Sequence, residues 1–120
     1  MAYDPNNVFA RILRGELPCK KVFENDDVLA FHDIKPQAPV HVLVIPKAAY
    51  VSLDDFAAEA RPAEIAAFFT AVGAIARQLG LAEDGYRILA NHGPNSHQEV
   101  PHFHVHIFGG RALGRMLAPG

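Results

Sequence analysis

The segment Pro101–Gly110 restricts the possible folds more than any other part of the chain, because histidine alternates in it with apolar residues. Its sequence is PHFHVHIFGG, which places histidines at positions 102, 104 and 106. Alternation with a period of two predicts a β-strand over Phe103–Phe108 with one buried face. The three imidazoles should project from one face, about 7 Å apart along the strand. Such a row suits a nucleophile with its partners, a metal site or a pH-sensitive surface.

The composition predicts a single domain over residues 1–120. Half of the residues are hydrophobic, a fifth are charged, and the formal net charge is −2. This balance argues against a nucleic-acid partner and against a polybasic membrane anchor. The one cysteine, Cys19, excludes an internal disulfide. Because neither a signal-peptide pattern nor a membrane-spanning apolar run is present, we expect a cytoplasmic protein without membrane contact.

The remaining pattern predicts an α+β fold. A short helical segment capped by Asn6 or Asn7 should lie within residues 1–15, and residues 111–120 should form a partly extended tail. Short β-rich runs bounded by turn residues predict four strands besides the histidine-bearing one. The five expected strands cover residues 20–24, 28–32, 41–46, 86–91 and 103–108.

One long helix is expected between the third and fourth strands, with Pro62 in its first turn and Gly80 just past its end. Its apolar stripe faces the core, but alanines occupy most of the other positions. A helix that is apolar nearly all round is buried on two sides, and a chain of this size has little material for the second side. A second copy of the chain is therefore the expected partner. The alternative is an alanine-rich surface that serves helix propensity.

The polar chemistry is concentrated between residues 91 and 110. Five of the seven histidines lie at positions 92–106, and no lysine or arginine occurs in this segment. An anion bound there would need imidazolium, amide side chains and backbone N–H groups, which suits a single phosphate better than a polyphosphate. An imidazole in such a site can attack phosphorus and form a covalent intermediate.

Two blocks of the chain resemble a known family. The pattern Gln98-x-Val100-x-His102-x-His104-x-His106-x-x-Gly109-Gly110 resembles the signature of the histidine-triad (HIT) superfamily. Residues 31–47, FHDIKPQAPVHVLVIPK, are similar to its mid-chain block. The Gly-Gly-Arg ending resembles the Hint branch, the purine nucleoside phosphoramidases.

This resemblance implies a fold and a set of catalytic residues. The implied fold is α+β, with a five-stranded antiparallel sheet, one long helix and one short helix, and a sheet that continues across a homodimer. His104 matches the nucleophile that takes up the nucleoside monophosphate. His102 and His106 match the flanking members of the triad, and His41 matches a fourth histidine on the neighbouring strand. With an imidazole pKa of about 6–7, His106 is the first candidate to protonate the leaving group.

The resemblance also implies how a nucleotide is bound. Asp33 matches the carboxylate that holds the ribose, with Ile34 beside it, and an apolar slot surrounds the purine. Ser96-His97 departs from the Gly-Gly pair that the family often has, so His97 narrows the phosphate pocket or adds a cation to it. The full implied nucleotide-binding set is Phe9, Ile12, Leu17, Phe31, Asp33, Ile34, Asn91, His97, Gln98, Glu99, His104, Val105 and His106.

The expected activity is hydrolysis of the P–N bond in purine nucleoside 5′-phosphoramidates, such as AMP joined to an amine. The expected ligands are that substrate and a purine nucleoside monophosphate, with no cofactor and no metal required. One alternative is a dinucleoside polyphosphate hydrolase of the Fhit type, against which the Gly-Gly-Arg ending argues. Another is a non-enzymatic protein that binds nucleotide or zinc. A closed zinc site needs four ligands, and no cysteine lies near the three histidines to supply one.

Overall fold

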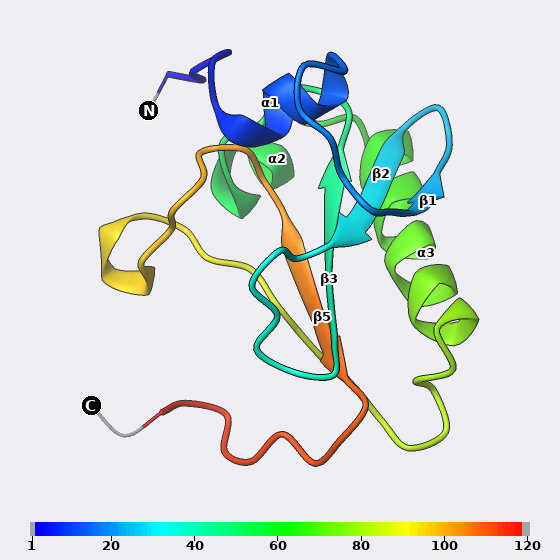
Figure 1. Cartoon of the computed structure of the whole chain (residues 1–120). Coiled ribbons are helices and arrows are strands. Elements are labelled where there is room, and N and C mark those ends of the chain that lie inside the picture. Colours follow the sequence, from blue (N-terminus) through cyan, green and yellow to red (C-terminus); the bar gives the residue numbers. More distant parts are fainter. Residues whose placement is uncertain (1, 119–120) are drawn as a thin grey trace.

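The structure, a computed structural model, describes residues 2–118. Its centre is a five-stranded antiparallel sheet in the spatial order β1-β2-β3-β5-β4 (Figure 1). The strands are β1 (Lys21–Glu24), β2 (Val28–His32), β3 (Val40–Pro46), β4 (Arg87–Leu89) and β5 (Val105–Gly109). The five-stranded antiparallel α+β fold is thus confirmed. The expected tail, 111–120, lies outside regular structure as far as it is described, and its last two residues lie outside the described range.

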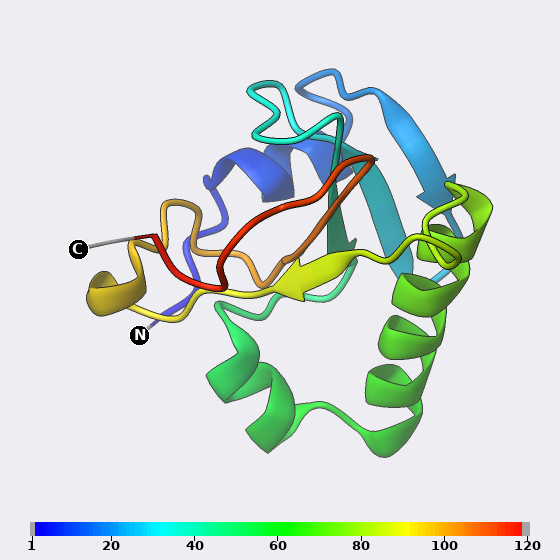
Figure 2. The same ribbon diagram turned by 90° about the horizontal axis from the view of Figure 1, so that it is seen from below.

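Helices cover both faces of the sheet. Figure 2 shows the sheet between α1 on one side and α2 with α3 on the other. The helices are α1 (Val8–Leu13), α2 (Leu53–Glu59) and α3 (Pro62–Gln78), and a short 3₁₀ helix, η1, covers Pro94–Ser96. Within residues 2–118, none of these helices has both the length and the apolar character needed to cross a bilayer.

The strand alternation builds two cores. In β3, Val42 and Val44 face α3 and α2, whereas Leu43 and Ile45 face α1. Because successive side chains point to opposite faces of a strand, one apolar run serves both layers. In β5, Val105 belongs to the core under α3. The histidines of this segment therefore point toward the α1 side, as the alternation predicted.

The expectation of a single short helix was wrong, because α2 is a second one. Ser52 caps it by accepting from the Asp54 N–H, while the Asp55 carboxylate accepts from the Val51 and Ser52 N–H groups. This capping box satisfies N–H groups that a helix terminus leaves unpaired. Phe56 then buries its ring between Phe68 and Phe103.

Three expected strands are shorter in the structure. β1 begins at Lys21, one residue later than expected, β4 keeps only Arg87–Leu89 of residues 86–91, and β5 begins at Val105, two residues later than expected. Strand pairing sets the ends of β4 and β5. The pairing of β4 with β5 ends at Leu89 and His106, and the pairing of β3 with β5 ends at Val44 and Val105. His102 and His104 therefore lie just before β5, outside regular secondary structure.

Within one chain, α3 buries one side only. Phe68, Val72 and Ile75 face the sheet, while Phe69 keeps 39% of its surface exposed. The edge strand β4 also leaves an apolar side chain exposed, with Ile88 at 44%. The predicted burial of a second side of this helix does not occur inside the chain.

Candidate active site

A cleft of about 590 Å³ opens on the α1 side of the sheet. It is lined by α1, by β2 and the turn after it, by β3 and β5, and by the β4–β5 loop, residues 90–104. Figure 1 shows that η1, in this loop, lies on the opposite side of β5 from β2. The cleft is lined by Val8, Phe9, Ile12, Pro18, Cys19, Phe31, His32, Asp33, Ile34, Lys35, Gln37, His41, Leu43, Asn91, Ser96, His97, Glu99, Val100, His104 and His106.

Most of the residues expected from the sequence meet in this cleft. Those that line it are Phe9, Ile12, Phe31, Asp33, Ile34, His41, Asn91, His97, Glu99, His104 and His106. Leu17, Gln98, His102 and Val105 are not part of its lining. Leu17 is half-buried, and its neighbours Pro18 and Cys19 line the cleft in its place.

Gln98 braces the β4–β5 loop instead of facing the cleft. Its side-chain oxygen accepts from the Gly93 N–H at 3.0 Å, and its amide nitrogen donates to the carbonyls of Val51 and Val100. The His97 N–H is also used inside the loop, since it donates to the Pro94 carbonyl. The sequence suggested that backbone N–H groups of this turn bind a phosphate. The N–H groups of Gly93 and His97 are already used inside the loop, so they are not free to do so.

His102 lies beneath the cleft and is fully buried. Its Nε2–H donates to the Pro46 carbonyl at 2.8 Å, so its Nδ1 accepts from the Tyr3 hydroxyl at 2.6 Å. Burial lowers the pKa of His102 to about 4. The first histidine of the row is thus a neutral structural group, and sequence reasoning missed its partner Tyr3, which is 99 residues away.

The hydrogen bonding of His104 fixes a neutral ring with one ring nitrogen left free. Its Nδ1 lies 2.7 Å from the His102 carbonyl, which can only accept, so the proton of the neutral ring is on Nδ1. The lone pair is consequently on Nε2. Burial is the main cause that lowers the pKa of His104 below its ordinary value, which keeps the ring neutral. Phe9 packs edge-on against the ring at 4.9 Å between centroids.

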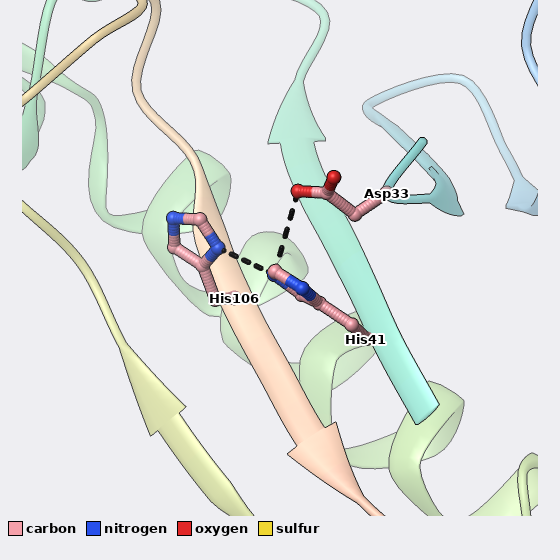
Figure 3. Close-up of side chains that lie close together, drawn as sticks. All are labelled: Asp33, His41 and His106. Carbon is pink, nitrogen blue, oxygen red and sulfur yellow. Dashed lines mark hydrogen bonds and ion pairs between the residues drawn. The ribbon is translucent and has the colours of Figure 1, made fainter. Parts of the chain in front are cut away.

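His41, His106 and Asp33 form an ordered hydrogen-bonded group (Figure 3). The Gln37 N–H donates to Nδ1 of His41 at 3.2 Å, so neutral His41 carries its proton on Nε2. That proton is donated to Nδ1 of His106 at 2.9 Å, with Oδ2 of Asp33 at 3.5 Å. His106 accepts on Nδ1 and therefore keeps its own proton on Nε2. This group presents one N–H donor, from His106, to the cleft.

Burial changes the role expected of His106. Burial, followed by the neighbouring His104 and His41, lowers the pKa of His106 to about 4. The free protein therefore holds His106 as a neutral hydrogen-bond donor at neutral pH, and the expected pKa of about 6–7 was wrong. A bound phosphate would bring negative charge beside the ring, and this charge raises the pKa of an imidazole.

Asp33, His41 and His106 also have the spacing of a metal site, because one ligand atom of each lies within 4.8 Å of the others. Metal-bound histidines donate their second ring N–H to an acceptor. Nδ1 of His41 instead faces the Gln37 N–H, which is a donor. The group therefore fits a chain of hydrogen bonds better than a resident metal ion.

The end of the cleft near α1 is apolar and open. Asn7 caps α1 by accepting from the Ala10 N–H, and this fixes Phe9 against Phe31 at 5.5 Å between ring centroids. Ile34 stands at the rim with 91% of its surface exposed. Such a slot suits a flat aromatic ring bound through its faces.

Comparison with known proteins identifies the family. The HIT domain model matches residues 14–113. The chain belongs to the HIT family. A HIT-like protein of 13.2 kDa from Azospirillum brasilense is 66% identical, with 98% of this chain and 97% of that protein covered. The purine nucleoside phosphoramidase of Escherichia coli K12 is 45% identical over 92% of each chain.

A solved HIT structure matches the fold. A HIT family hydrolase from Clostridium thermocellum superposes with a TM-score of 0.86 at 38% identity, covering 93% of this chain and 97% of its own. The relatives at 66% and 45% identity match along almost their whole length. The sequence resemblance to the HIT family is therefore confirmed, and relatives of this chain include hydrolases.

Proposed function

We propose that this HIT protein hydrolyses the P–N bond of purine nucleoside 5′-phosphoramidates through a nucleotidyl-histidine intermediate on His104. The observation that carries the proposal is the bond from Nδ1 of His104 to the His102 carbonyl. It leaves the lone pair on Nε2 of a residue that lines the cleft. The 45%-identical relative named purine nucleoside phosphoramidase supports the choice of substrate.

The reaction proceeds in two displacements at phosphorus. Nε2 of His104 forms a bond to phosphorus, the P–N bond to the amine breaks, and its electron pair goes to the amine nitrogen, which takes up a proton from an acid in the cleft. Water then attacks phosphorus, the bond from phosphorus to Nε2 breaks, and its electron pair returns to the His104 ring. The nucleoside monophosphate leaves, and the proton lost by the water restores the acid. The Nε2–H of His106 is placed to donate to a phosphoryl oxygen or to the departing nitrogen.

The rest of the cleft binds the nucleoside. The apolar slot of Phe9, Ile12 and Phe31 takes the purine. Asp33 takes the ribose hydroxyls, although its Oδ1 also accepts from the Lys35 N–H within a turn. Glu99 and Asn91 lie at the phosphate end.

A comparison of three substrate classes tests this proposal. The protein should turn over an adenosine phosphoramidate at least about tenfold faster, as kcat/KM, than a dinucleoside polyphosphate or an unrelated phosphomonoester. Faster turnover of the dinucleoside polyphosphate would instead favour the Fhit-type alternative.

Chelation tests the proposed independence from metal. Dialysis against EDTA should change kcat/KM by less than about twofold, because a histidine nucleophile needs no metal-bound water. Loss of turnover on chelation, restored by added zinc, would replace the covalent mechanism with metal-activated water.

The second proposed partner is another copy of the chain. β4 is an edge strand, and exposed apolar side chains lie on it and on α3, among them Ile88, Leu89 and Phe69. Unpaired strand edges and apolar patches favour association. We propose that two copies join here, so that the sheet continues from β4 to β4.

Sedimentation analysis tests the dimer. The protein should sediment as a dimer at micromolar concentration, and the double variant I88K/L89K should sediment as a monomer, because lysine on an edge strand opposes strand pairing. L53K is the matched control, since Leu53 is exposed to 45% on α2. A monomer of the unmodified protein, or dissociation by the control alone, would refute this interface.

A further inference from the structure

The peptide unit between His102 and Phe103 carries the carbonyl that fixes the His104 ring, yet strand pairing does not hold it. The pairing of β5 with β3 begins only at Val105. The carbonyl accepts from Nδ1 of His104 at 2.7 Å, and the N–H of the same peptide unit donates to the Tyr50 carbonyl at 2.7 Å. Hydrogen bonds that run in a chain through one amide strengthen each other. The orientation of this peptide unit therefore decides how firmly the His104 ring is held.

The side chain of His102 anchors this peptide unit from within the protein. It is fully buried, and both of its ring nitrogens are hydrogen-bonded, Nε2 to the Pro46 carbonyl and Nδ1 to the Tyr3 hydroxyl. The Pro46 carbonyl can only accept, so it takes the one proton of the neutral ring, and Nδ1 needs a donor. The Tyr3 hydroxyl supplies that donor at 2.6 Å, and the two rings pack edge-on with 5.5 Å between their centroids.

The N-terminal turn fixes Tyr3 in this position. The Asp4 carbonyl accepts from the backbone N–H of Asn7 at 3.2 Å and from its side-chain amide at 2.7 Å. Asn7 is also the N-cap of α1, and Arg14 at the other end of this helix donates to the Pro5 carbonyl at 2.6 Å. Tyr3 is thus tied to the helix that forms one wall of the cleft, although it does not line the cleft itself.

We propose that Tyr3 is a positioning residue for the nucleophile. Its hydroxyl holds the His102 ring, this ring holds the carbonyl of the same residue, and the carbonyl keeps the proton of neutral His104 on Nδ1. The lone pair then stays on Nε2, the nitrogen that attacks phosphorus. The role of His104 rests on the phosphoramidase activity proposed above, whereas its tautomer is measurable without any substrate.

Loss of the Tyr3 hydroxyl should loosen this arrangement. Nδ1 of the buried His102 ring would have no donor, and a buried acceptor without a partner is unfavourable. The ring and its peptide unit would then shift, because strand pairing does not hold them. The His104 ring would lose its fixed acceptor, and its proton would distribute between the two nitrogens.

Nitrogen NMR of the imidazole rings tests the inference, because the ¹⁵N shifts report which nitrogen carries the proton. At pH 8 the unmodified protein should carry the His102 proton on Nε2 and the His104 proton on Nδ1. Y3F keeps the aromatic ring and loses only the hydroxyl, and it should show His104 as a mixture of both tautomers. An unchanged His104 tautomer in Y3F would overturn the inference. A proton on Nδ1 of His102 in the unmodified protein would overturn it without any variant.

Single-turnover kinetics measure the consequence for the reaction. Y3F should form the nucleotidyl-histidine about tenfold more slowly, because small misplacements of a reacting group slow the chemical step. The Kd for AMP should change by less than about twofold, since Tyr3 does not line the cleft. In H102L the tyrosine has no ring nitrogen to bond, so adding Y3F should change the rate by less than about twofold. A further tenfold loss in that background would show that Tyr3 acts by another route, against the inference.

N25A is the matched control for a loss of stability. The Asn25 side chain holds the β1–β2 turn by accepting from the N–H groups of Asp27 and Val28 at 2.9 Å, and it does not line the cleft. N25A should keep the His104 tautomer and the rate, whereas a tautomer mixture in this variant too would assign the effect to general loosening and overturn the inference. If the unmodified protein does not turn over adenosine phosphoramidate, the proposed function fails, and the NMR measurement still decides the role of Tyr3.

Discussion

Replacing His104 with alanine should lower kcat/KM for an adenosine phosphoramidate by about 10⁴ or more, because no other group can form the covalent intermediate. Because Nδ1 of this ring donates to the His102 carbonyl, Nε2 is the unprotonated nitrogen that can attack phosphorus. AMP affinity should fall far less, since Asp33 and the apolar slot remain. Steady-state kinetics and calorimetric titration with AMP measure the two effects.

A matched histidine variant controls for unspecific effects. His92 is exposed, does not line the cleft, and bonds through Nδ1 to the Ser52 hydroxyl at 2.6 Å. H92N keeps an amide group that can hydrogen-bond to Ser52, and it should retain most of the activity. Activity of H104A above a few per cent, in protein free of contaminating enzyme, would remove His104 from the nucleophile role.

Acid should destabilise the fold through His102. Its pKa is about 4 in the folded chain against an ordinary 6.5, so the unfolded chain binds more protons between these pH values. The contribution of His102 to stability is therefore complete above pH 6.5 and is lost as the pH falls toward 4. The loss amounts to about 3 kcal/mol of unfolding free energy.

Denaturant unfolding from pH 8 to pH 4 measures this loss. In H102Q the amide can donate to the Pro46 carbonyl and accept from Tyr3, but it does not titrate. The variant should be less stable than the unmodified protein at pH 8, and the difference should shrink by about 3 kcal/mol toward pH 4. Parallel stability curves for the two proteins would show that His102 is not the source of acid sensitivity.

The sequence predicted the face of each histidine but not its depth. A period of two places residues 102, 104 and 106 on one side, and the structure confirms this. Depth depends on what covers each ring. Tyr3 and Phe9 cover His102, while His106 stays in the cleft beside His41. Contacts with residues so distant in the chain have no local signal in the sequence.

Loop geometry explains the other differences. Gln98 belongs to the matched motif, yet its amide braces the backbone, because the loop turns its side chain toward Val51. By contrast, the Ser52-x-x-Asp55 pattern of α2 was present in the sequence as a capping signal, and it would have predicted the second short helix.

The central claim is that His104 becomes covalently nucleotidylated during turnover. A single-turnover reaction with adenosine phosphoramidate, quenched in base and digested, tests it by tandem mass spectrometry. The account predicts an adenylyl group on His104 that forms and decays at rates consistent with turnover and is absent in H104A. Full turnover of the bound substrate with no adduct at any time, or an adduct on His102 or His106 alone, would contradict it.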